Sequence, residues 1–174
     1  MNMLLTRIQQ RAKLYADEFV AVRHWLHAHP ELSYQEFETS RFIQSKLNEW
    51  GIAFEVKAGT GVVGMIEGKE PHSRIIALRA DMDALPIAEE NEVPYRSTNE
   101  GVMHACGHDV HTTCLLGAVK ILNELKTEWS GTVKFIFQPG EERNPGGASL
   151  LIKEGVLEHP KPQGIIGLHV HPGL

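Results

Sequence analysis

The chain has 174 residues, a hydrophobic content of 42%, a charged content of 22% and a formal net charge of −5 at pH 7. These values fit a globular domain with a sizeable core and give no reason to expect nucleic acid or a membrane as a partner. No apolar run approaches the roughly 20 residues of a membrane helix, the N-terminus does not resemble a signal peptide, and two cysteines make no disulfide framework, so we expect a cytoplasmic protein.

The first half of the chain alternates between helix and strand patterns. Apolar residues recur at close to a helical period over Leu4–Leu26, and a second helix is expected over about Gln35–Trp50, with Gly51 as its stop. Two short strands follow, "IAFEV" and "GVVGMIEG", joined by the turn-forming "AGTG". The apolar run "RIIALRAD" then predicts a buried strand that ends at Asp81.

The second half continues the alternation. A third helix is expected to begin near Asp109, an N-cap residue type, and "GTVKFIFQPGEE" predicts a buried strand broken by Pro139-Gly140. A short helix over Ala148–Lys153 and a last strand, "GIIGLHVH", complete the series. The pattern predicts an α/β fold, with a largely parallel mixed sheet covered by helices on both faces.

Histidines are unevenly distributed along the chain. Most of the ten gather in three groups, at His24, His27 and His29, at His104, His108 and His111, and at His169 and His171. For His24 and His27 we expect the C-terminal end of the first helix, where imidazoles complement the helix dipole. The second group lies in the segment "MHACGHDVH", which also contains Cys106 and needs a different explanation.

Three apolar strands run directly into side chains of metal-ligand type. The pairs are Asp81 and Asp83, Glu141 and Glu142, and His169 and His171. Ligands of open α/β sheets bind outside the carboxyl ends of the strands, and the histidine-rich segment before the third helix belongs to the same edge. Divalent cations explain such a cluster most simply, because unpaired buried charges are costly. Cysteine and histidine favour zinc or another late first-row ion, and the carboxylates are typical of catalytic sites, often with two ions.

Four ordered motifs resemble one family. They are "ALRADMDALP", "MHACGHDVHTT", "FIFQPGEE" and "GLHVHP", and together they resemble peptidase family M20, the aminoacylase/carboxypeptidase family, in its amidohydrolase branch. The resemblance implies hydrolysis of the amide bond of N-acyl amino acids or short peptides, with two divalent ions, zinc or manganese and also cobalt or nickel. It implies these roles: metal ligands Cys106, His108, Glu142 and His169, general base Glu141, and Asp83 as the aspartate that orients a ligand histidine.

The resemblance also bears on the extent of the chain. Family members are considerably longer, and a smaller domain that mediates dimerisation and helps close over the substrate follows the "GLHVHP" motif. We therefore expect residues 1–174 to be the N-terminal portion of the catalytic domain, truncated before that domain, with an unpaired sheet edge. The full-length form is expected to be a homodimer, and the isolated chain to bind metal incompletely and show little hydrolysis.

Other interpretations of these residues remain open at this point. Cys106 could be a small buried hydrophobe, or the nucleophile of a hydrolase that needs no metal. Glu141 and Glu142 could be a solvated turn pair, and Asp109 could serve only as an N-cap. Cys114 is expected in the core. The whole chain could also be a metal-binding, catalytically inactive truncated homologue; a structural zinc domain is disfavoured, because no Cys/His set has the required spacing.

Overall fold

Five helices and five strands lie within residues 3–171, the part of the chain that the computed structural model describes. The helices are α1 (Met3–Leu14), α2 (Ala16–Ala28), α3 (Phe37–Glu49), α4 (His108–Glu124) and α5 (Gly147–Lys153). The strands are β1 (Phe54–Lys57), β2 (Gly61–Glu67), β3 (Ile75–Asp81), β4 (Thr132–Gln138) and β5 (Gly164–Gly167). The predicted elements are therefore present, with ends that differ by a few residues.

The strands form one mixed sheet in the order β1-β2-β4-β3-β5. β1 and β2 form an antiparallel hairpin, and β2 also runs antiparallel to β4. β3 is parallel to both β4 and β5, with Asp81 opposite Gln138 and Arg79 opposite Gly167. Because these three parallel strands end at the same edge, the segments that follow them emerge side by side.

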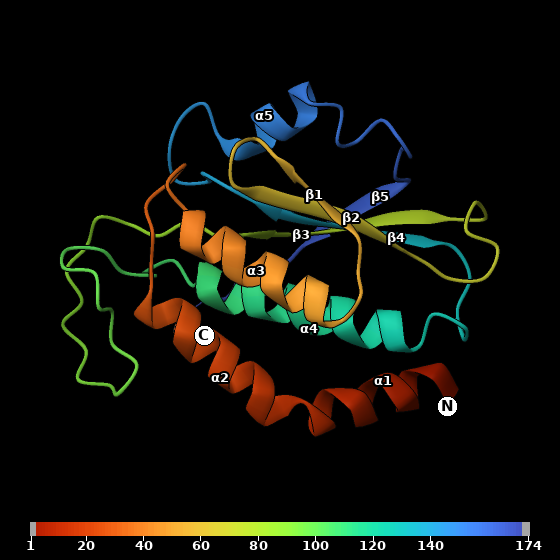
Figure 1. Ribbon diagram of the computed structural model, residues 1–174, viewed down its shortest axis with the longest axis horizontal. Coiled ribbons are helices and arrows are strands. Elements are labelled where there is room, and N and C mark those ends of the chain that lie inside the picture. Colours follow the sequence, from red (N-terminus) through yellow and green to blue (C-terminus); the bar gives the residue numbers. More distant parts are fainter. Residues whose placement is uncertain (1–2, 172–174) are drawn as a thin grey trace.

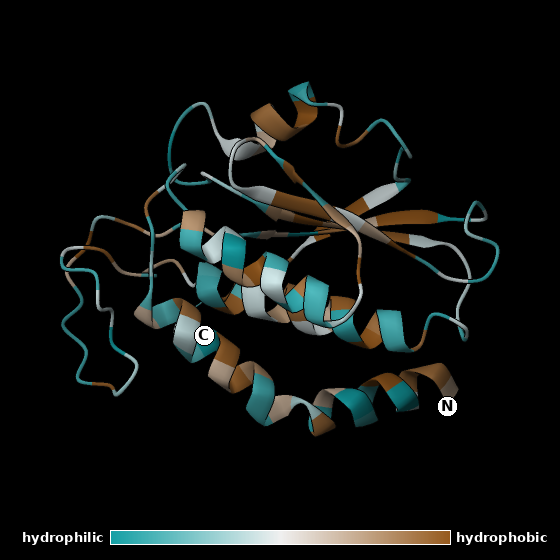
Figure 2. Cartoon of the chain, viewed as in Figure 1, coloured by the Kyte–Doolittle hydropathy of each residue, from teal (hydrophilic) through white to brown (hydrophobic). Residues whose placement is uncertain are grey.

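Helices cover both faces of the sheet, as the sequence predicts. Figure 1 shows α3 and α4 against one face, α1 and α2 outside them, and α5 alone on the other face. Figure 2 shows hydrophobic residues concentrated along the sheet. The core between the sheet and α4 contains Phe135, Phe137 and Leu116, all fully buried. Each such side chain stabilises the fold by about 1.5–3 kcal/mol relative to exposure.

The first helical segment is not continuous. It divides at Tyr15, and α1 and α2 meet there at an angle (Figure 1). The sequence could not show this bend, because the apolar period continues through Tyr15. In the structure the Phe19 N–H still bonds to the Tyr15 carbonyl. α2 packs on α4 and buries Val22 and Leu26, whereas α1 buries no residue. The helical segment therefore divides between a part with buried side chains and a part without them.

The last strand is shorter and more exposed than expected. β5 ends at Gly167, so His169 and His171 lie beyond it, and the strand alternation that placed both on one face does not apply. Every residue of β5 is exposed, and Ile165, Ile166 and Leu168 are exposed by 53%, 52% and 76%. This is the apolar sheet edge that the sequence predicts.

No helix within residues 3–171 is both long enough and apolar enough to span a membrane.

Candidate metal centre

The site lies where β3 and β4 end, α4 begins and the segment after β5 arrives. α4 begins at His108, directly after Gly107, whose φ of +86° belongs to the left-handed region that favours glycine. A Cβ at Gly107 would lie 2.3 Å from Val170 Cγ2. Glycine at this position therefore lets the segment that carries His169 approach the first turn of α4.

The structure brings together all the predicted ligands and the predicted base. Cys106, His108 and His169 form one group whose potential ligand atoms lie within 4.8 Å of one another, and His108, Glu141 and Glu142 form a second. Cys106 Sγ lies 3.3 Å from His169 Nε2, and His108 Nε2 lies 3.8 Å from Glu142 Oε1. His108 belongs to both groups and is 1% exposed. Two neighbouring cations sharing these donors would suit this arrangement.

The orientation of the His108 ring is fixed by the contacts of its Nδ1 atom with Asp83. Its Nδ1 lies 2.9 Å from the main-chain oxygen of Asp83 and 3.3 Å from that residue's Oδ1, so Nδ1 donates to the carbonyl. Nε2 is buried and has no hydrogen-bond partner among the described residues. Burial alone would lower the pKa of His108, but the hydrogen bond to Asp83 and the charges of Asp81, Asp83 and Glu142 hold it above its ordinary value. The carboxylates that favour a charged imidazole would equally favour a bound cation.

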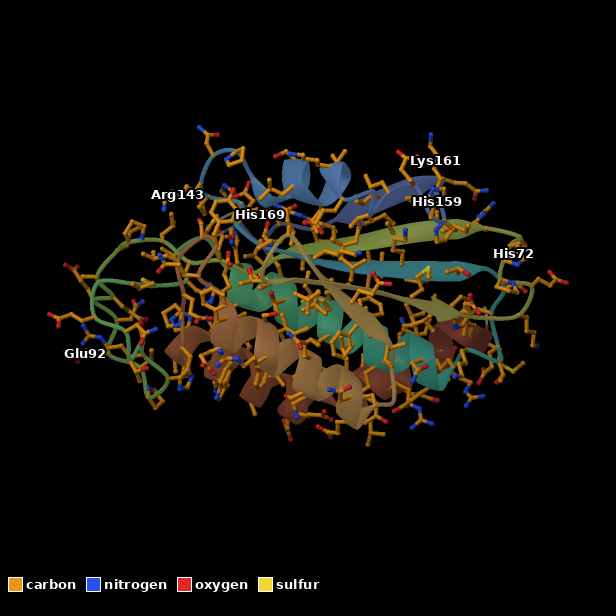
Figure 3. All side chains as sticks on the ribbon, turned by 45° about the horizontal axis from the view of Figure 1, so that its top comes forward. His72, Glu92, Arg143, His159, Lys161 and His169 are labelled. Atoms are coloured by element: carbon orange, nitrogen blue, oxygen red, sulfur yellow. The ribbon has the colours of Figure 1, made fainter. Side chains whose placement is uncertain are left out.

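His169 presents its other ring nitrogen to the centre. Nδ1 lies 2.6 Å from the carbonyl oxygen of Val170, and since a carbonyl only accepts, Nδ1 carries the proton. The Nε2 lone pair then faces Cys106. Figure 3 shows His169 at the end of the sheet near Arg143, whereas His72 and His159 lie at the opposite end. The histidines that gather at the site are thus His108, His111 and His169, and not the whole set.

Asp83 connects three segments of the site. It is 1% exposed, and its Oδ2 accepts hydrogen bonds from the Ser33 hydroxyl at 2.6 Å and the Glu142 N–H at 3.0 Å. Burial would raise the pKa of Asp83, but the His108 ring beside the carboxylate and hydrogen bonds from Ser33 and the Glu142 main chain outweigh burial and lower the pKa to about 2. Asp83 is therefore ionised and holds His108 and the Glu142 backbone in register.

Another buried carboxylate, which no sequence pattern singled out, holds the turn before the glutamate pair. Glu36 Oε1 accepts the Gly140 N–H at 2.7 Å, and Oε2 accepts the Thr60 hydroxyl at 2.6 Å. Gly140 has a φ of +52°, and a Cβ there would lie 2.3 Å from the Tyr34 ring. Burial raises the pKa of Glu36. Pro139-Gly140 thus ends β4 in a fixed turn, and Glu141 and Glu142 follow as exposed residues.

The electrostatics of Cys106 disfavour a free thiolate. Burial, followed by the hydrogen bond and charge of Glu142 and the charges of Asp81 and Glu141, raises the pKa of the Cys106 thiol to about 11. A cysteine nucleophile requires the opposite shift. A cation beside the sulfur would reverse the balance, because it neutralises the same carboxylates and favours the thiolate.

A third cluster of potential donors, Asp81, His108 and His111, lies beside the first two. His111 Nδ1 lies 2.6 Å from Asp81 Oδ1, and His111 Nε2 accepts the Val170 N–H at 3.0 Å. Arg79 binds the other oxygen of Asp81 at 2.5 Å. Both nitrogens of His111 are therefore occupied by protein groups. Sequence reasoning gave His111 no role, although its spacing of three from His108 places both on one helix face.

A sequence model of peptidase family M20/M25/M40 matches residues 77–174, which is more than half of the chain. The chain belongs to this family.

Individual relatives agree with this assignment. An N-acyl-L-amino acid amidohydrolase of Geobacillus stearothermophilus is 44% identical over 154 residues, covering 88% of this chain and 41% of the relative. A Bacillus subtilis M20-family structure, described as a dinuclear metal binding peptidase, has 43% identity and a TM-score of 0.86, covering 93% of this chain and 45% of its own. A methicillin-resistant Staphylococcus aureus structure described as an aminohydrolase has 38% identity and a TM-score of 0.90, covering 98% and 44%. The chain thus spans less than half the length of these M20 relatives.

Two predictions about the first turn of α4 and the end of α2 need correction. His27 does not simply complement a helix dipole: it is 4% exposed, with Nδ1 2.8 Å from Asp109 Oδ2 and Nε2 2.9 Å from Glu89 Oε1. Asp109 is not the N-cap, which is Gly107, and its carboxylate also pairs with Arg23 Nε at 2.8 Å. Asp109 therefore anchors α4 to α2.

The predicted core position of Cys114 is wrong. Cys114 is exposed and lines a cavity of about 350 Å³ that is enclosed by α4, β3, β5 and the segment that follows β5. Its wall is mostly apolar and includes Leu115, Ile166 and Leu168. An apolar helix pattern could not show that one side of α4 faces this groove and not the sheet. His171 is also exposed and belongs to none of the three donor groups of the described residues.

Proposed function

We propose that residues 1–174 form the N-terminal portion of the catalytic domain of a metal-dependent amidohydrolase. Its substrates would be N-acyl amino acids or short peptides, and the products an acyl acid and a free amino acid. The observation that carries the proposal is the convergence of Cys106, Glu142 and His169 on His108, whose buried Nε2 has no hydrogen-bond partner among residues 3–171. The description of the Geobacillus relative as an N-acyl-L-amino acid amidohydrolase supports the reaction class.

The cofactors proposed are two divalent ions held by Cys106, His108, Glu142 and His169. Zinc or manganese is favoured, and cobalt or nickel suits the same donors, because a thiolate and imidazoles prefer late first-row ions while carboxylates also accept manganese. The Bacillus structure, described as a dinuclear metal binding peptidase, supports a paired site. When bound, such ions would lower the pKa of a water molecule and polarise the amide carbonyl.

Glu141 is proposed as the general base. Its exposed carboxylate lies in the donor group that includes His108 and Glu142, so it can take a proton from water and pass it to the leaving amide nitrogen. Asp83 serves as the residue that orients His108. The presence of Glu141 at this position favours an active enzyme over a metal-binding homologue without catalysis, which is the alternative.

Two further features of the whole protein are proposed with this function. A cytoplasmic location fits, because the ligand set requires a reduced Cys106, and thiols persist in a reducing compartment. A homodimer is proposed for the full-length form, as the family resemblance implies.

The test uses a chimera in which this chain replaces the matched segment of the Geobacillus amidohydrolase. We expect the chimera to release amino acids from N-acetyl and N-benzoyl amino acids, and a chelator to abolish the activity until a divalent metal is restored. A folded, metal-loaded chimera that cleaves none of these substrates would contradict the proposed reaction. Activity that survives complete metal removal would instead favour the Cys106 nucleophile.

A further inference from the structure

His111 is a buried histidine whose two nitrogens connect two different parts of the site. The ring is 5% exposed, and Asp81, which is 1% exposed and paired with Arg79, lies 2.6 Å from Nδ1. Because an ionised carboxylate only accepts hydrogen bonds, Nδ1 carries the proton and Nε2 keeps its lone pair. That lone pair accepts the N–H of Val170 at 3.0 Å.

The segment that donates this bond lies at the exposed edge of the sheet. β5 pairs only with β3 and ends at Gly167, so residues 168–171 lie beyond the ladder. Outside the ladder between β5 and β3, the Val170 N–H bond to His111 is the one main-chain hydrogen bond shown between residues 168–171 and the rest of the described chain. Val170 adjoins His169, whose ring packs edge-on against His111 with centroids 4.6 Å apart. The position of His169 therefore depends on a contact made by α4.

We propose that His111 is a positioning residue for His169, held in the required tautomer by Asp81. The buried Asp81 carboxylate fixes the His111 ring, and the ring fixes the Val170 main chain and so places His169 Nε2 opposite Cys106. This inference rests on the proposed function, because it takes His169 as a metal ligand. Although Asp81, His108 and His111 lie close together, His111 is not itself a ligand, because Nε2 already accepts a protein N–H.

Three substitutions separate the two hydrogen bonds of His111. His111→Gln places an acceptor near the position of Nε2 and can keep the bond from Val170. His111→Asn places a donor near the position of Nδ1 and can keep the bond to Asp81. His111→Phe preserves a planar ring and removes both bonds.

The first measurement is the affinity of the 174-residue chain for Co²⁺ and Zn²⁺, by competition with a chelator of known affinity. Substitution of groups that orient ligands typically lowers metal affinity by about 10–100-fold. We expect a loss in that range for His111→Phe, and a smaller loss for His111→Gln than for His111→Asn. Equal affinities for wild type and His111→Phe would overturn the proposal. Denaturant unfolding of the metal-free chains identifies any variant whose loss reflects general destabilisation.

A double-mutant cycle distinguishes a positioning residue from a ligand. If His111 acts through His169, adding His111→Phe to His169→Ala should cause no further loss of affinity, because the group being positioned is gone. A further loss equal to that of His111→Phe alone would show that His111 binds metal directly and would overturn the proposal.

The second measurement needs no metal. Hydrogen exchange of the Val170 amide in the metal-free chain should be slow in wild type and His111→Gln, and faster by tenfold or more in His111→Phe. Unchanged exchange in His111→Phe would overturn the positioning role even if metal binding proved as proposed. A third outcome is that the Val170 amide loses its protection in His111→Phe although the wild-type chain binds no metal. That result would support the positioning of this segment and contradict the proposed function.

Discussion

The nitrogen of His108 that faces the donor groups illustrates what single residues contribute. A buried polar atom without a partner costs about 1–3 kcal/mol, and Nε2 of His108 is such an atom. The neighbouring Asp81 and Glu142 carboxylates add a negative field around it. A bound cation would offset both effects. Substitution of a single ligand should therefore change the amount of metal that the chain binds.

Cys106→Ala should reduce the metal bound by the chain, because it removes the thiolate and leaves the carboxylates without their soft partner. Cys114→Ala is the matched control, since Cys114 is exposed and belongs to none of the described donor groups. Elemental analysis of protein purified without chelator provides the measurement. Equal metal content in the two variants would remove Cys106 from the ligand set.

Glu141→Gln should leave metal content unchanged and lower amide hydrolysis by the chimera. The amide cannot accept a proton from water, and general acid–base catalysis typically contributes about 10²–10⁴-fold. Glu92→Gln is the control, because Glu92 is an exposed loop residue whose side chain points away from the site (Figure 3). Native rates for Glu141→Gln with N-acetyl amino acids would show that another group is the base.

At the scale of the element, the first turn of α4 has two functions on two sides. His108 faces the donor groups, while Asp109 faces α2 and binds His27 and Arg23. The hydrogen bond to Asp109 raises the pKa of His27 against the opposing effect of burial, and the bond to Glu89 adds to the rise. A histidine charged in the folded state thus joins α4, α2 and the loop that contains Glu89.

This charged histidine predicts a pH dependence of stability. Since the folded-state pKa of His27 lies above its ordinary value of about 6.5, its contribution is fully present below that pH and is lost as pH rises through the folded pKa. His27→Gln should therefore destabilise the chain more at pH 6 than at pH 9, measured as the free energy of unfolding in urea. His24→Gln, on the same helix but stacked on Tyr95 without an ion pair among the described residues, is the control. An equal loss at both pH values would mean that His27 stabilises by packing alone.

Elements were easier to predict than their contacts. The apolar strands and the turn at Pro139-Gly140 follow from local patterns, and because parallel strands share an edge, the convergence of Asp83, Glu142 and His169 followed as well. Other features depend on which side of an element another element covers. Cys114, the buried Glu36 and the His27 ion pairs are of this kind. A helical period cannot distinguish the side of α4 that faces the sheet from the side that faces an open groove.

At the scale of the whole molecule, the exposed edge formed by β5 determines how the isolated chain should behave. Unpaired main-chain groups and apolar side chains on an edge strand promote association. We expect the 174-residue chain to form dimers or larger species in sizing chromatography at micromolar concentration. Ile166→Lys should shift it toward the monomer, whereas Ile152→Lys, at a comparably exposed residue on α5, should not. A wild-type monomer across this range would contradict the expectation.

We also expect weak hydrolysis by the isolated chain. The chain spans 41% of the Geobacillus relative, and residues that complete the substrate site are expected in the remainder. Assaying the chain beside the chimera measures this directly. Full activity of the 174-residue chain would mean that its donor groups suffice without the additional length.

Two of the buried histidine–carboxylate pairs, Asp81 with His111 and His27 with Asp109, lead to an expectation about related sequences. Replacing one member of such a pair leaves a buried polar group without its hydrogen-bond partner, which typically costs about 1–3 kcal/mol, whereas replacing both by apolar groups of the same shape can be nearly neutral. Descendants of this gene should therefore lose or keep the two members of a pair together. Across many M20 sequences, positions 81 and 111 should covary, as should positions 27 and 109, and neither pair should be linked to the other.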